Sequence, residues 1–275
     1  MTVAETLRRS TEFLERKGVP SPRVDAEHLV GKALGLTRLD LYLHYDRLLG
    51  EDELAAAREL VARRGGREPL AYILGEWGFR RLTLRVDARA LIPRPETEAV
   101  VERCLERLAG LVEPSVLDVG TGTGAIALAI ADEHSGAQVT AIDASPEALA
   151  LAAENAERCG LRVELLERDL TAGLPGGPYD LVVSNPPYVE PGELLGLQPE
   201  VRDWEPREAL VGDRMTEAVT RGAREVLRPG GWLVLEVADG SAEEVSASVS
   251  RLGFVAVSAS RDLAGRERVV EGRWA

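Results

Sequence analysis

The stretch Leu117-Asp118-Val119-Gly120-Thr121-Gly122-Thr123-Gly124 decides the fold of this chain. The apolar residues at its start predict a buried strand, and the apolar run from Ala125 to about Asp132 predicts a helix. The glycines between them allow the backbone to approach a ligand closely. A strand, a glycine-rich turn and a helix in this order indicate the first unit of a doubly wound α/β sheet.

The rest of the chain continues this alternation of strands and helices. Further strands are predicted at residues 139–142, 163–166, 179–184, 232–237, 254–258 and 268–270. Helices are predicted at residues 146–156, at residues 215–227 and after Ser241, which has capping-box spacing to Glu244. Because such alternation requires a largely parallel sheet, we expect a Rossmann-like domain over residues 95–275.

The first 68 residues show only helical periodicity. Apolar residues recur on one face of three successive helices before residue 65. We therefore expect a small all-helical N-terminal domain over residues 1–68. Residues 69–94 are expected to be a linker that contains a β-hairpin, because the residues from Trp77 to Val86 read as two short strands about a tight turn.

The composition restricts the possible partners. The 275 residues carry a formal net charge of −13, which disfavours a sequence-independent grip on a phosphate backbone. No apolar run reaches membrane-spanning length, and the first residues lack the apolar core of a signal peptide. Cys104 and Cys159 do not have metal-ligand spacing. We expect a cytoplasmic monomer without a metal site, and without direct contact to nucleic acid or membrane.

Ser184-Asn185-Pro186-Pro187-Tyr188 follows a predicted buried strand, at the edge of the sheet where open α/β folds bind ligands. The two prolines fix φ at about −65° and remove two N–H donors, which makes the turn rigid. We expect the Asn185 side-chain oxygen and the Pro186 carbonyl to point toward one spot beside the Tyr188 ring. This arrangement suits a planar NH₂ group, although a stiffened loop without chemistry explains the turn by itself equally well. Asn185, Pro186 and Tyr188 are the candidate catalytic residues, and Pro187 joins them in the candidate substrate site.

The glycine-rich turn alone leaves two cofactors open. Gly120, Gly122 and Ala125 also fit the dinucleotide fingerprint, so a nicotinamide enzyme is an alternative. A dinucleotide needs a pyrophosphate site, whereas S-adenosylmethionine is cationic at sulfur and has no phosphate. Asp118, Asp143 and Asp169 stand at the tips of consecutive strands, and acids suit the ribose, adenine amino and methionine ammonium groups better than a pyrophosphate.

We therefore expect S-adenosylmethionine as the cofactor. Asp143 is placed to accept from the ribose hydroxyls, and Asp169 and Leu170 are expected beside the adenine. The full set of candidate cofactor-binding residues is Gly120, Thr121, Gly122, Thr123, Gly124, Asp143, Asp169, Leu170 and Asn185.

A second proline-rich segment, Leu91-Ile92-Pro93-Arg94-Pro95-Glu96-Thr97-Glu98, precedes the glycine-rich turn. Its two prolines disfavour regular structure up to Glu96. The simplest interpretation is a stiff connector. The functional interpretation places Arg94 and Glu96 at the rim of the site as substrate-binding residues.

In these motifs the chain resembles the release-factor glutamine methyltransferases of the HemK/PrmC type, along nearly its whole length. The matching stretches are residues 72–77, 91–98, 117–124, 184–188, 205–207 and 262–266. The resemblance implies a class I S-adenosylmethionine-dependent methyltransferase domain with an antiparallel last strand, preceded by a helical domain that recognises the partner. By the same resemblance, the substrate is the glutamine of the Gly-Gly-Gln loop of class I peptide chain release factors, methylated on its side-chain nitrogen.

Three alternatives to this function follow from the same residues. A glutamine methyltransferase acting on a ribosomal protein is similar in its motifs, but is disfavoured by the connector Arg94-Pro95-Glu96-Thr97. An amino-directed DNA or RNA adenine methyltransferase shares the Asn-Pro-Pro-Tyr turn, but the net charge counts against it. A cofactor-binding module without activity does not need that turn. Two departures from the family are Leu170, where an aromatic residue is common, and a shortened loop at Val211–Met215.

Overall fold

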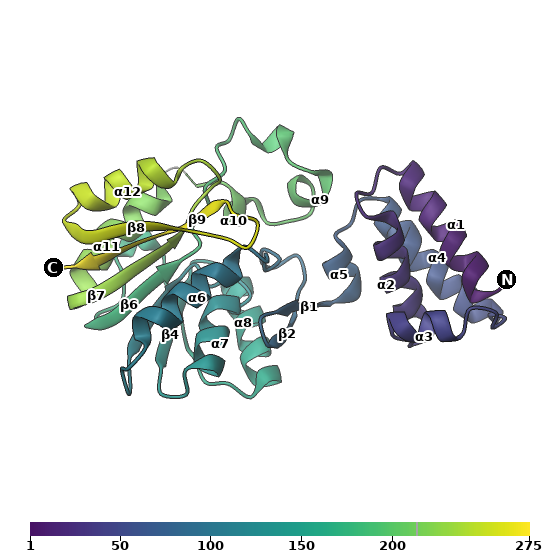
Figure 1. Ribbon diagram of the computed structural model, residues 1–275, viewed down its shortest axis with the longest axis horizontal. Helices are drawn as coiled ribbons and strands as arrows, with labels where there is room; N and C mark the ends of the chain where they lie inside the picture. Colours follow the sequence, from purple (N-terminus) through teal and green to yellow (C-terminus); the bar gives the residue numbers. More distant parts are fainter. Residues whose placement is uncertain (213) are drawn as a thin grey trace. The chain divides into compact units, whose positions relative to one another are not determined.

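The computed structural model describes residues 1–212 and 214–275 and divides the chain into two compact units (Figure 1). One unit is helical and comprises Met1–Glu76 together with Leu197–Trp204. The other comprises Trp77–Gly196 and Glu205–Ala275 and contains the large sheet. The chain therefore leaves the sheet-containing unit after Gly196 and returns to it at Glu205. Asp213, in the loop expected to be shortened, lies outside the described residues.

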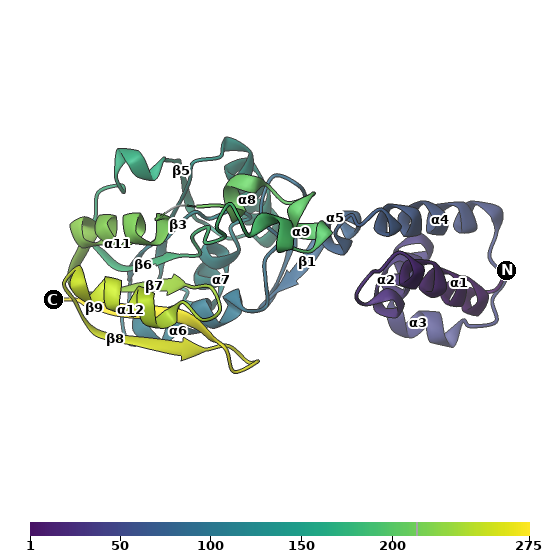
Figure 2. The ribbon, with the colours of Figure 1, turned by 90° about the horizontal axis from the view of Figure 1, so that it is seen from above.

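The helical unit contains α1 (Val3–Arg16), α2 (Pro22–Leu34), α3 (Arg38–Leu43), α4 (Glu51–Gly65), α5 (Leu70–Leu74) and α9 (Pro199–Arg202). Helices α1, α2 and α4 pack against one another (Figure 2). Thr2 and Glu5 form a capping box that starts α1, since each side chain accepts from the backbone amide of the other residue. Leu14, Leu29 and Val61 meet in the core between α1, α2 and α4.

A buried ion cluster connects Leu197–Trp204, the second piece of this unit, to its other helices. Arg64 of α4 pairs with Asp25 of α2 at 2.6 Å and with Glu200 of α9 at 2.8 Å, and these side chains are 6%, 8% and 9% exposed. Arg67 pairs with Glu200 at 2.5 Å. Buried charges are costly unless paired, so this cluster fixes α9 to the helical unit.

A seven-stranded sheet forms the centre of the other unit, in the order β5-β4-β3-β6-β7-β9-β8. Its strands are β3 (Ser115–Val119), β4 (Gln138–Asp143), β5 (Glu164–Glu167), β6 (Tyr179–Ser184), β7 (Leu227–Glu236), β8 (Phe254–Arg261) and β9 (Glu267–Trp274). Strands β3 to β7 are parallel, and β9 runs antiparallel between β7 and β8. The predicted Rossmann-like sheet with an antiparallel last strand is confirmed. Its order reverses at β3, which creates the switch point where such sheets bind ligands.

Helices cover both faces of this sheet (Figures 1 and 2). They are α6 (Thr97–Leu108), α7 (Ala125–Glu133), α8 (Pro146–Cys159), α11 (Met215–Val226) and α12 (Ala242–Arg251). The unit also contains the short helix α10 (Arg207–Leu210) and 3₁₀ turns at Leu170–Ala172 and Leu194–Gly196. Helices α6 and α7 share one apolar core with the sheet, and α11 and α12 share the other. Among the described residues, no helix combines the length and apolar character needed to cross a membrane.

The predicted hairpin consists of β1 (Glu76–Phe79) and β2 (Leu82–Arg85), with Arg80 in the turn at a φ of 49°. Phe79 and Leu84 are buried in the core shared with α7. The buried Asn155 of α8 accepts from the Arg85 amide at 2.7 Å and donates to the Thr123 carbonyl at 2.9 Å. It therefore connects the hairpin to the glycine-rich turn.

The predicted capping box before the last helix is wrong. Ser241 precedes α12, but its hydroxyl donates to the carbonyl of Ala238 at 2.8 Å and makes no bond to the helix amides. Its backbone is helical, with φ −96° and ψ −1°, whereas a capping side chain reaches the first turn from an extended conformation.

Candidate active site

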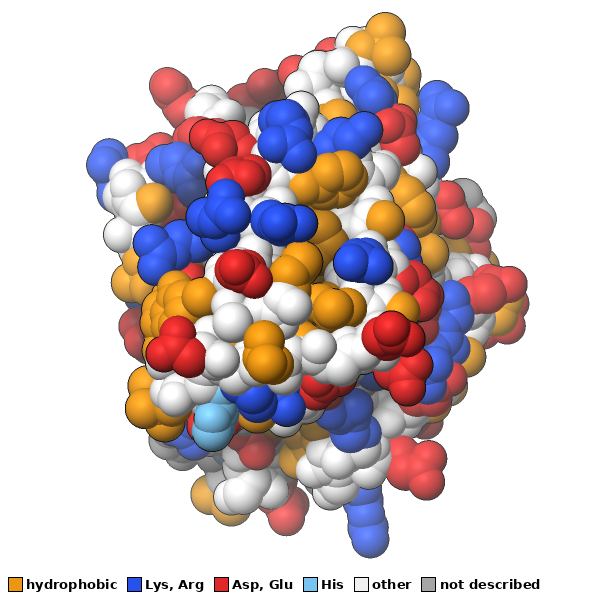
Figure 3. Space-filling model, turned by 90° about the vertical axis from the view of Figure 1, so that its right-hand side faces the viewer, with side chains coloured by type: hydrophobic (Ala, Val, Ile, Leu, Met, Phe, Trp, Pro, Cys, Tyr) orange, Lys and Arg blue, Asp and Glu red, His pale blue; other side chains and the backbone are white. Residues whose placement is uncertain are grey.

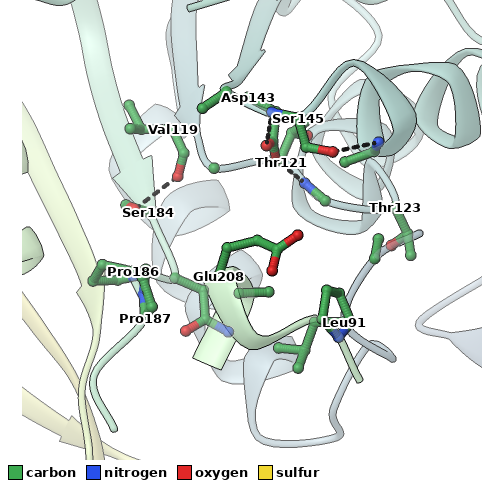
Figure 4. Close-up of a pocket in the computed structure, with 18 of the residues that line it drawn as sticks. Leu91, Val119, Thr121, Thr123, Asp143, Ser145, Ser184, Pro186, Pro187 and Glu208 are labelled. Carbon is green, nitrogen blue, oxygen red and sulfur yellow. Dashed lines mark hydrogen bonds between the residues drawn. The ribbon is translucent and has the colours of Figure 1, made fainter. Parts of the chain in front are cut away.

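A pocket of about 630 Å³ opens where β3, β4 and β6 end (Figure 4). The site residues predicted from sequence that line it are Gly120, Thr121, Gly122, Thr123, Asp143, Asp169, Leu170, Asn185, Pro186, Pro187 and Arg94. Among the described residues, three predicted ones lie outside its lining: Gly124, Tyr188 and Glu96. The fold thus brings the glycine-rich turn and the Asn-Pro-Pro-Tyr turn to one pocket, although they lie on different strands.

The glycine-rich turn is held by its own backbone amides. Gly120 and Gly122 have φ of 76° and 55°, a left-handed conformation that favours glycine. The amides of Gly120 and Thr121 donate to the Ile142 carbonyl at 2.9 and 3.0 Å, and the amide of Gly122 donates to the Asp143 carboxylate at 2.9 Å. The protein itself therefore uses three amides of this turn, which are not available to a pyrophosphate.

The basic side chains of the pocket are also engaged by the protein. Three arginines line it: Arg89 pairs with two neighbouring carboxylates, Arg94 pairs with the buried Glu205, and Arg168 donates to the Gly173 carbonyl. In contrast, Figure 4 shows the carboxylate of Glu208 directed into the pocket. The lining therefore fits a cationic ligand with hydroxyl groups better than a phosphate.

Gly124 has a structural place at the start of α7. Its φ is 82°, and a Cβ there would lie 3.1 Å from the Leu128 side chain and 3.3 Å from that of Ala152. The residue allows α7 and α8 to approach closely. Its predicted contact with the cofactor stays a prediction.

Asp118 lies in the core, although the sequence suggested that it joins the other strand-tip acids at the ligand. It is fully buried, its Oδ2 accepts from the Thr121 hydroxyl at 2.7 Å, and its Oδ1 has no hydrogen-bond partner among the described residues. It is not among the described residues that line the pocket. Burial raises the pKa of this carboxyl from 3.8 to about 7, against the opposing effect of the Thr121 bond.

The raised pKa of Asp118 predicts a pH-dependent stability. Because the folded protein binds this proton more tightly than the unfolded chain, the stabilisation present at acid pH is lost as the pH rises through about 7. Between pH 5 and pH 8 the loss is roughly 2–3 kcal/mol. Urea unfolding at pH 5 and at pH 8 measures how far the free energy of unfolding falls between them. In Asp118→Asn this fall should be smaller than in the unsubstituted protein by that amount. Equal falls would contradict the assignment.

The Asn-Pro-Pro-Tyr turn is anchored at both ends. The Ser184 hydroxyl donates to the Val119 carbonyl at 2.7 Å, which joins β6 to β3, and the Val189 amide donates to the Leu210 carbonyl at 3.0 Å. Figure 4 shows Pro186 and Pro187 on the pocket wall below Ser184. The side chain of Tyr188 is 38% exposed, and burial raises the pKa of its hydroxyl to about 12. The phenol therefore stays neutral at physiological pH.

The proline-rich connector is held by ion pairs. The buried Glu205 pairs with Arg94 and accepts from the Ile92 amide at 3.3 Å. Glu96 accepts from Arg266 at 2.8 Å. Arg94 thus lines the pocket while it is paired with Glu205. Glu96 lies just before α6 and is paired with Arg266.

Two residues next to Asn185 were missed from the sequence. The Thr97 hydroxyl donates to Glu236 at 2.6 Å, and the Asn185 amide nitrogen donates to Thr97 at 3.5 Å. The signal for Glu236 was an acid directly after the apolar run Trp232–Leu235. Further lining residues that were not predicted include Arg89, Ala90, Leu91, Ile92, Ser145, Arg168, Glu208 and Met215. Across residues 1–212 and 214–275, no three His, Cys, Asp or Glu side chains gather as a metal site.

Comparisons with known proteins cover nearly the whole chain. Residues 5–75 match the family model described as PrmC N-terminal domain, and residues 98–196 match the Methyltransferase small domain. The release factor glutamine methyltransferase of Geobacter sulfurreducens is 45% identical over 276 residues, covering 99% of this chain and 96% of that protein. The enzyme of the same name from Deinococcus radiodurans is 44% identical, covering 99% of both chains.

A solved structure supports the fold alone. The 16S rRNA N2 G1207 methyltransferase of T. thermophilus, in complex with AdoMet and guanosine, superposes with a TM-score of 0.54 at 20% identity. The match covers 73% of this chain and 50% of that one. It agrees with the class I methyltransferase sheet described above.

Proposed function

The chain belongs to the release factor glutamine methyltransferase family, and on this basis we propose that it methylates the glutamine of the Gly-Gly-Gln motif in class I peptide chain release factors. In the proposed transfer, the side-chain amide nitrogen would bond to the methyl carbon of S-adenosylmethionine as the bond from that carbon to sulfur breaks. The sulfonium would leave as a neutral thioether, and the alkylated nitrogen would lose one proton to water. The observation that carries the proposal is that Asn185 and the glycine-rich turn line the same pocket. We further propose that the protein acts as a cytoplasmic monomer without direct contact to nucleic acid or membrane.

The chemistry requires the enzyme to orient a weak nucleophile. An amide nitrogen is poorly nucleophilic because its lone pair is delocalised into the carbonyl. If the Asn185 Oδ1 and the Pro186 carbonyl each accept one N–H of the substrate amide, the remaining lobe of nitrogen is aimed at the methyl group. The same two oxygens favour the positive charge that develops on nitrogen, so their stabilisation grows toward the transition state. Tyr188 is proposed to stack on the amide plane.

The cofactor supplies an electrophilic methyl group on a sulfonium sulfur. We propose that residues 120–124 enclose its methionine and ribose part, that Asp143 accepts from the ribose hydroxyls, and that Asp169 and Leu170 flank the adenine. The carboxylate of Glu208 adds negative charge to the pocket wall, which suits a cation. Arg94 and Glu96 remain proposed substrate-binding residues. Both belong to the connector, and each forms an ion pair, with Glu205 and Arg266 respectively.

Asp143 gives a test of cofactor binding. Its Oδ2 accepts from Gly122 and its Oδ1 accepts from the Ser145 amide at 3.0 Å, so the carboxylate both shapes the turn and faces the pocket. Asp143→Ala is expected to raise the Kd for S-adenosylmethionine at least about 10-fold, the usual effect of losing a charged hydrogen bond. Calorimetry measures this, with Glu164→Ala on the neighbouring strand β5 as the matched control. Unchanged binding in Asp143→Ala would contradict its proposed role.

The helical unit is proposed to recognise the release factor. Figure 3 shows hydrophobic side chains among both basic and acidic ones on its visible face, a mixture that suits a protein more than a polyanion. Exposed apolar residues of this unit are concentrated in and after α3, where Leu39, Leu43 and Leu48 are 69%, 71% and 75% exposed. Apolar exposure of this kind marks a surface that a partner can cover.

Radiolabelled methyl transfer tests the substrate. A class I release factor, a ribosomal protein and DNA are offered in parallel, and the modified residue is located by mass spectrometry. We expect label only on the glutamine of the Gly-Gly-Gln motif, and none after that glutamine is replaced by glutamate. Transfer to the ribosomal protein or to DNA, with none to the release factor, would overturn the proposal.

A further inference from the structure

A short hydrogen-bonded chain starts at the side chain of Asn185. It runs from the Asn185 amide nitrogen to the Thr97 hydroxyl at 3.5 Å, and from that hydroxyl to the Glu236 carboxylate at 2.6 Å. Asn185 follows β6, Thr97 begins α6, and Glu236 ends β7. Thr97 and Glu236 are only 5% and 2% exposed. Three separate elements therefore converge on one amide group.

The direction of this chain is set by its last member. A hydroxyl has one proton, and Thr97 gives that proton to Glu236. The oxygen of Thr97 then acts as an acceptor, so the NH₂ of Asn185 is directed toward Thr97. An asparagine amide has nearly the same shape after a half turn, and only its hydrogen-bond partners distinguish the two orientations.

We propose that Thr97 and Glu236 are positioning residues that hold the Asn185 amide with its oxygen toward the substrate. The inference rests on the proposed function, in which Asn185 Oδ1 accepts an N–H of the substrate glutamine. With the amide reversed, an NH₂ group would face the NH₂ of the substrate, and two donors repel. Thr97 and Glu236 therefore act on the reaction through Asn185 without touching the reacting atoms.

The charge on Glu236 gives this chain a pH dependence. Burial, with a smaller contribution from the nearby Glu96, raises the pKa of Glu236 to about 7, against the opposing effects of Thr97, Arg268 and Asn185. The Tyr188 hydroxyl interacts electrostatically with this carboxylate and stays neutral in this range. Above pH 7 the carboxylate only accepts, which fixes the direction of the chain. Below it, the protonated group is itself a donor, and the Asn185 amide is free to reverse.

The test compares four variants in methyl transfer to a release factor. Thr97→Val removes the hydroxyl at nearly constant shape and is expected to lower kcat at least about 10-fold, as loss of orientation does, with the calorimetric Kd for S-adenosylmethionine unchanged. Thr97→Ser restores the hydroxyl and most of the rate. In the unsubstituted enzyme, kcat is expected to fall below pH 7 as Glu236 becomes protonated. Glu236→Gln keeps an acceptor that does not titrate, so this fall should disappear. Thr140→Val is the matched control, because that threonine also donates to a glutamate, Glu164, at 3.0 Å.

A second measurement does not depend on the substrate. The side-chain ¹⁵N resonances of Asn185, identified by their loss in Asn185→Asp, should shift with an apparent pKa near 7 in the unsubstituted protein and not in Glu236→Gln. Wild-type kcat in Thr97→Val, or resonances that do not titrate, would overturn the positioning role. Titrating resonances in an enzyme that does not methylate a release factor would support the positioning role and overturn the proposed substrate.

Discussion

Replacing Asn185 with alanine is expected to lower the rate of methyl transfer by roughly 10³-fold, because the substrate amide loses one of its two acceptors and its orientation. Binding of S-adenosylmethionine is expected to remain largely intact, because the glycine-rich turn and Asp143 line the pocket independently of the Asn185 side chain. Single-turnover transfer and calorimetry measure the two effects separately. An equal loss of methyl transfer and of S-adenosylmethionine binding would contradict the proposal that Asn185 acts mainly on the substrate amide.

The chain contains one other asparagine, Asn155, which serves as the control for Asn185→Ala. Asn155 is fully buried and joins the backbone of Arg85 to that of Thr123. Asn155→Ala leaves these groups without partners and is expected to destabilise the protein by about 1–3 kcal/mol. Asn185→Ala should leave the unfolding free energy nearly unchanged. A large loss of stability in Asn185→Ala would show that its activity defect reflects folding.

The second large effect is expected at Arg64. Arg64→Met removes the cation between Asp25 and Glu200 and leaves two buried carboxylates. Among the described residues, only Glu200 then keeps an ion pair, with Arg67. Breaking a buried pair in this way costs about 3–5 kcal/mol. Urea unfolding followed by circular dichroism measures the loss. Arg8→Met is the control, because its partner Glu12 lies on the surface and the pair is exposed.

Neutralising the acids distinguishes a charge effect from a packing effect. When Asp25→Asn is added to Arg64→Met, a substantial part of the lost stability should return, because one uncompensated charge is removed. If the double variant is as unstable as Arg64→Met, the guanidinium contributes mainly through packing and through its bond to the Glu68 carbonyl.

Local sequence signals were sufficient to predict the sheet and the two turns. The run from Tyr179 to Ser184 was predicted as a strand and is β6 with the same bounds. It is apolar except for Asp180 and Ser184, which are buried and form hydrogen bonds with the neighbouring strand β3. Asn185 follows it into the pocket because the carboxyl ends of parallel strands meet at one edge. Periodicity and turn chemistry act within a few residues, so they can be read without the fold.

The features that escaped prediction depend on contacts distant in sequence. Glu236 meets Thr97 across 139 positions, and Arg67 meets Glu200 across 133. Asp118 was expected at the ligand because it ends a strand, but which way a strand-end side chain turns is decided by the packing around it. Neither spacing nor composition contains this information.

The excursion of the chain through the helical unit has a consequence for protein engineering. A chimera that exchanges residues 1–76 for those of a relative would leave Glu200 facing foreign helices, since its partners Arg64 and Arg67 would be replaced. Residues 197–204 must therefore be exchanged together with residues 1–76. A chimera that keeps the original residues 197–204 is expected to fold poorly around Glu200.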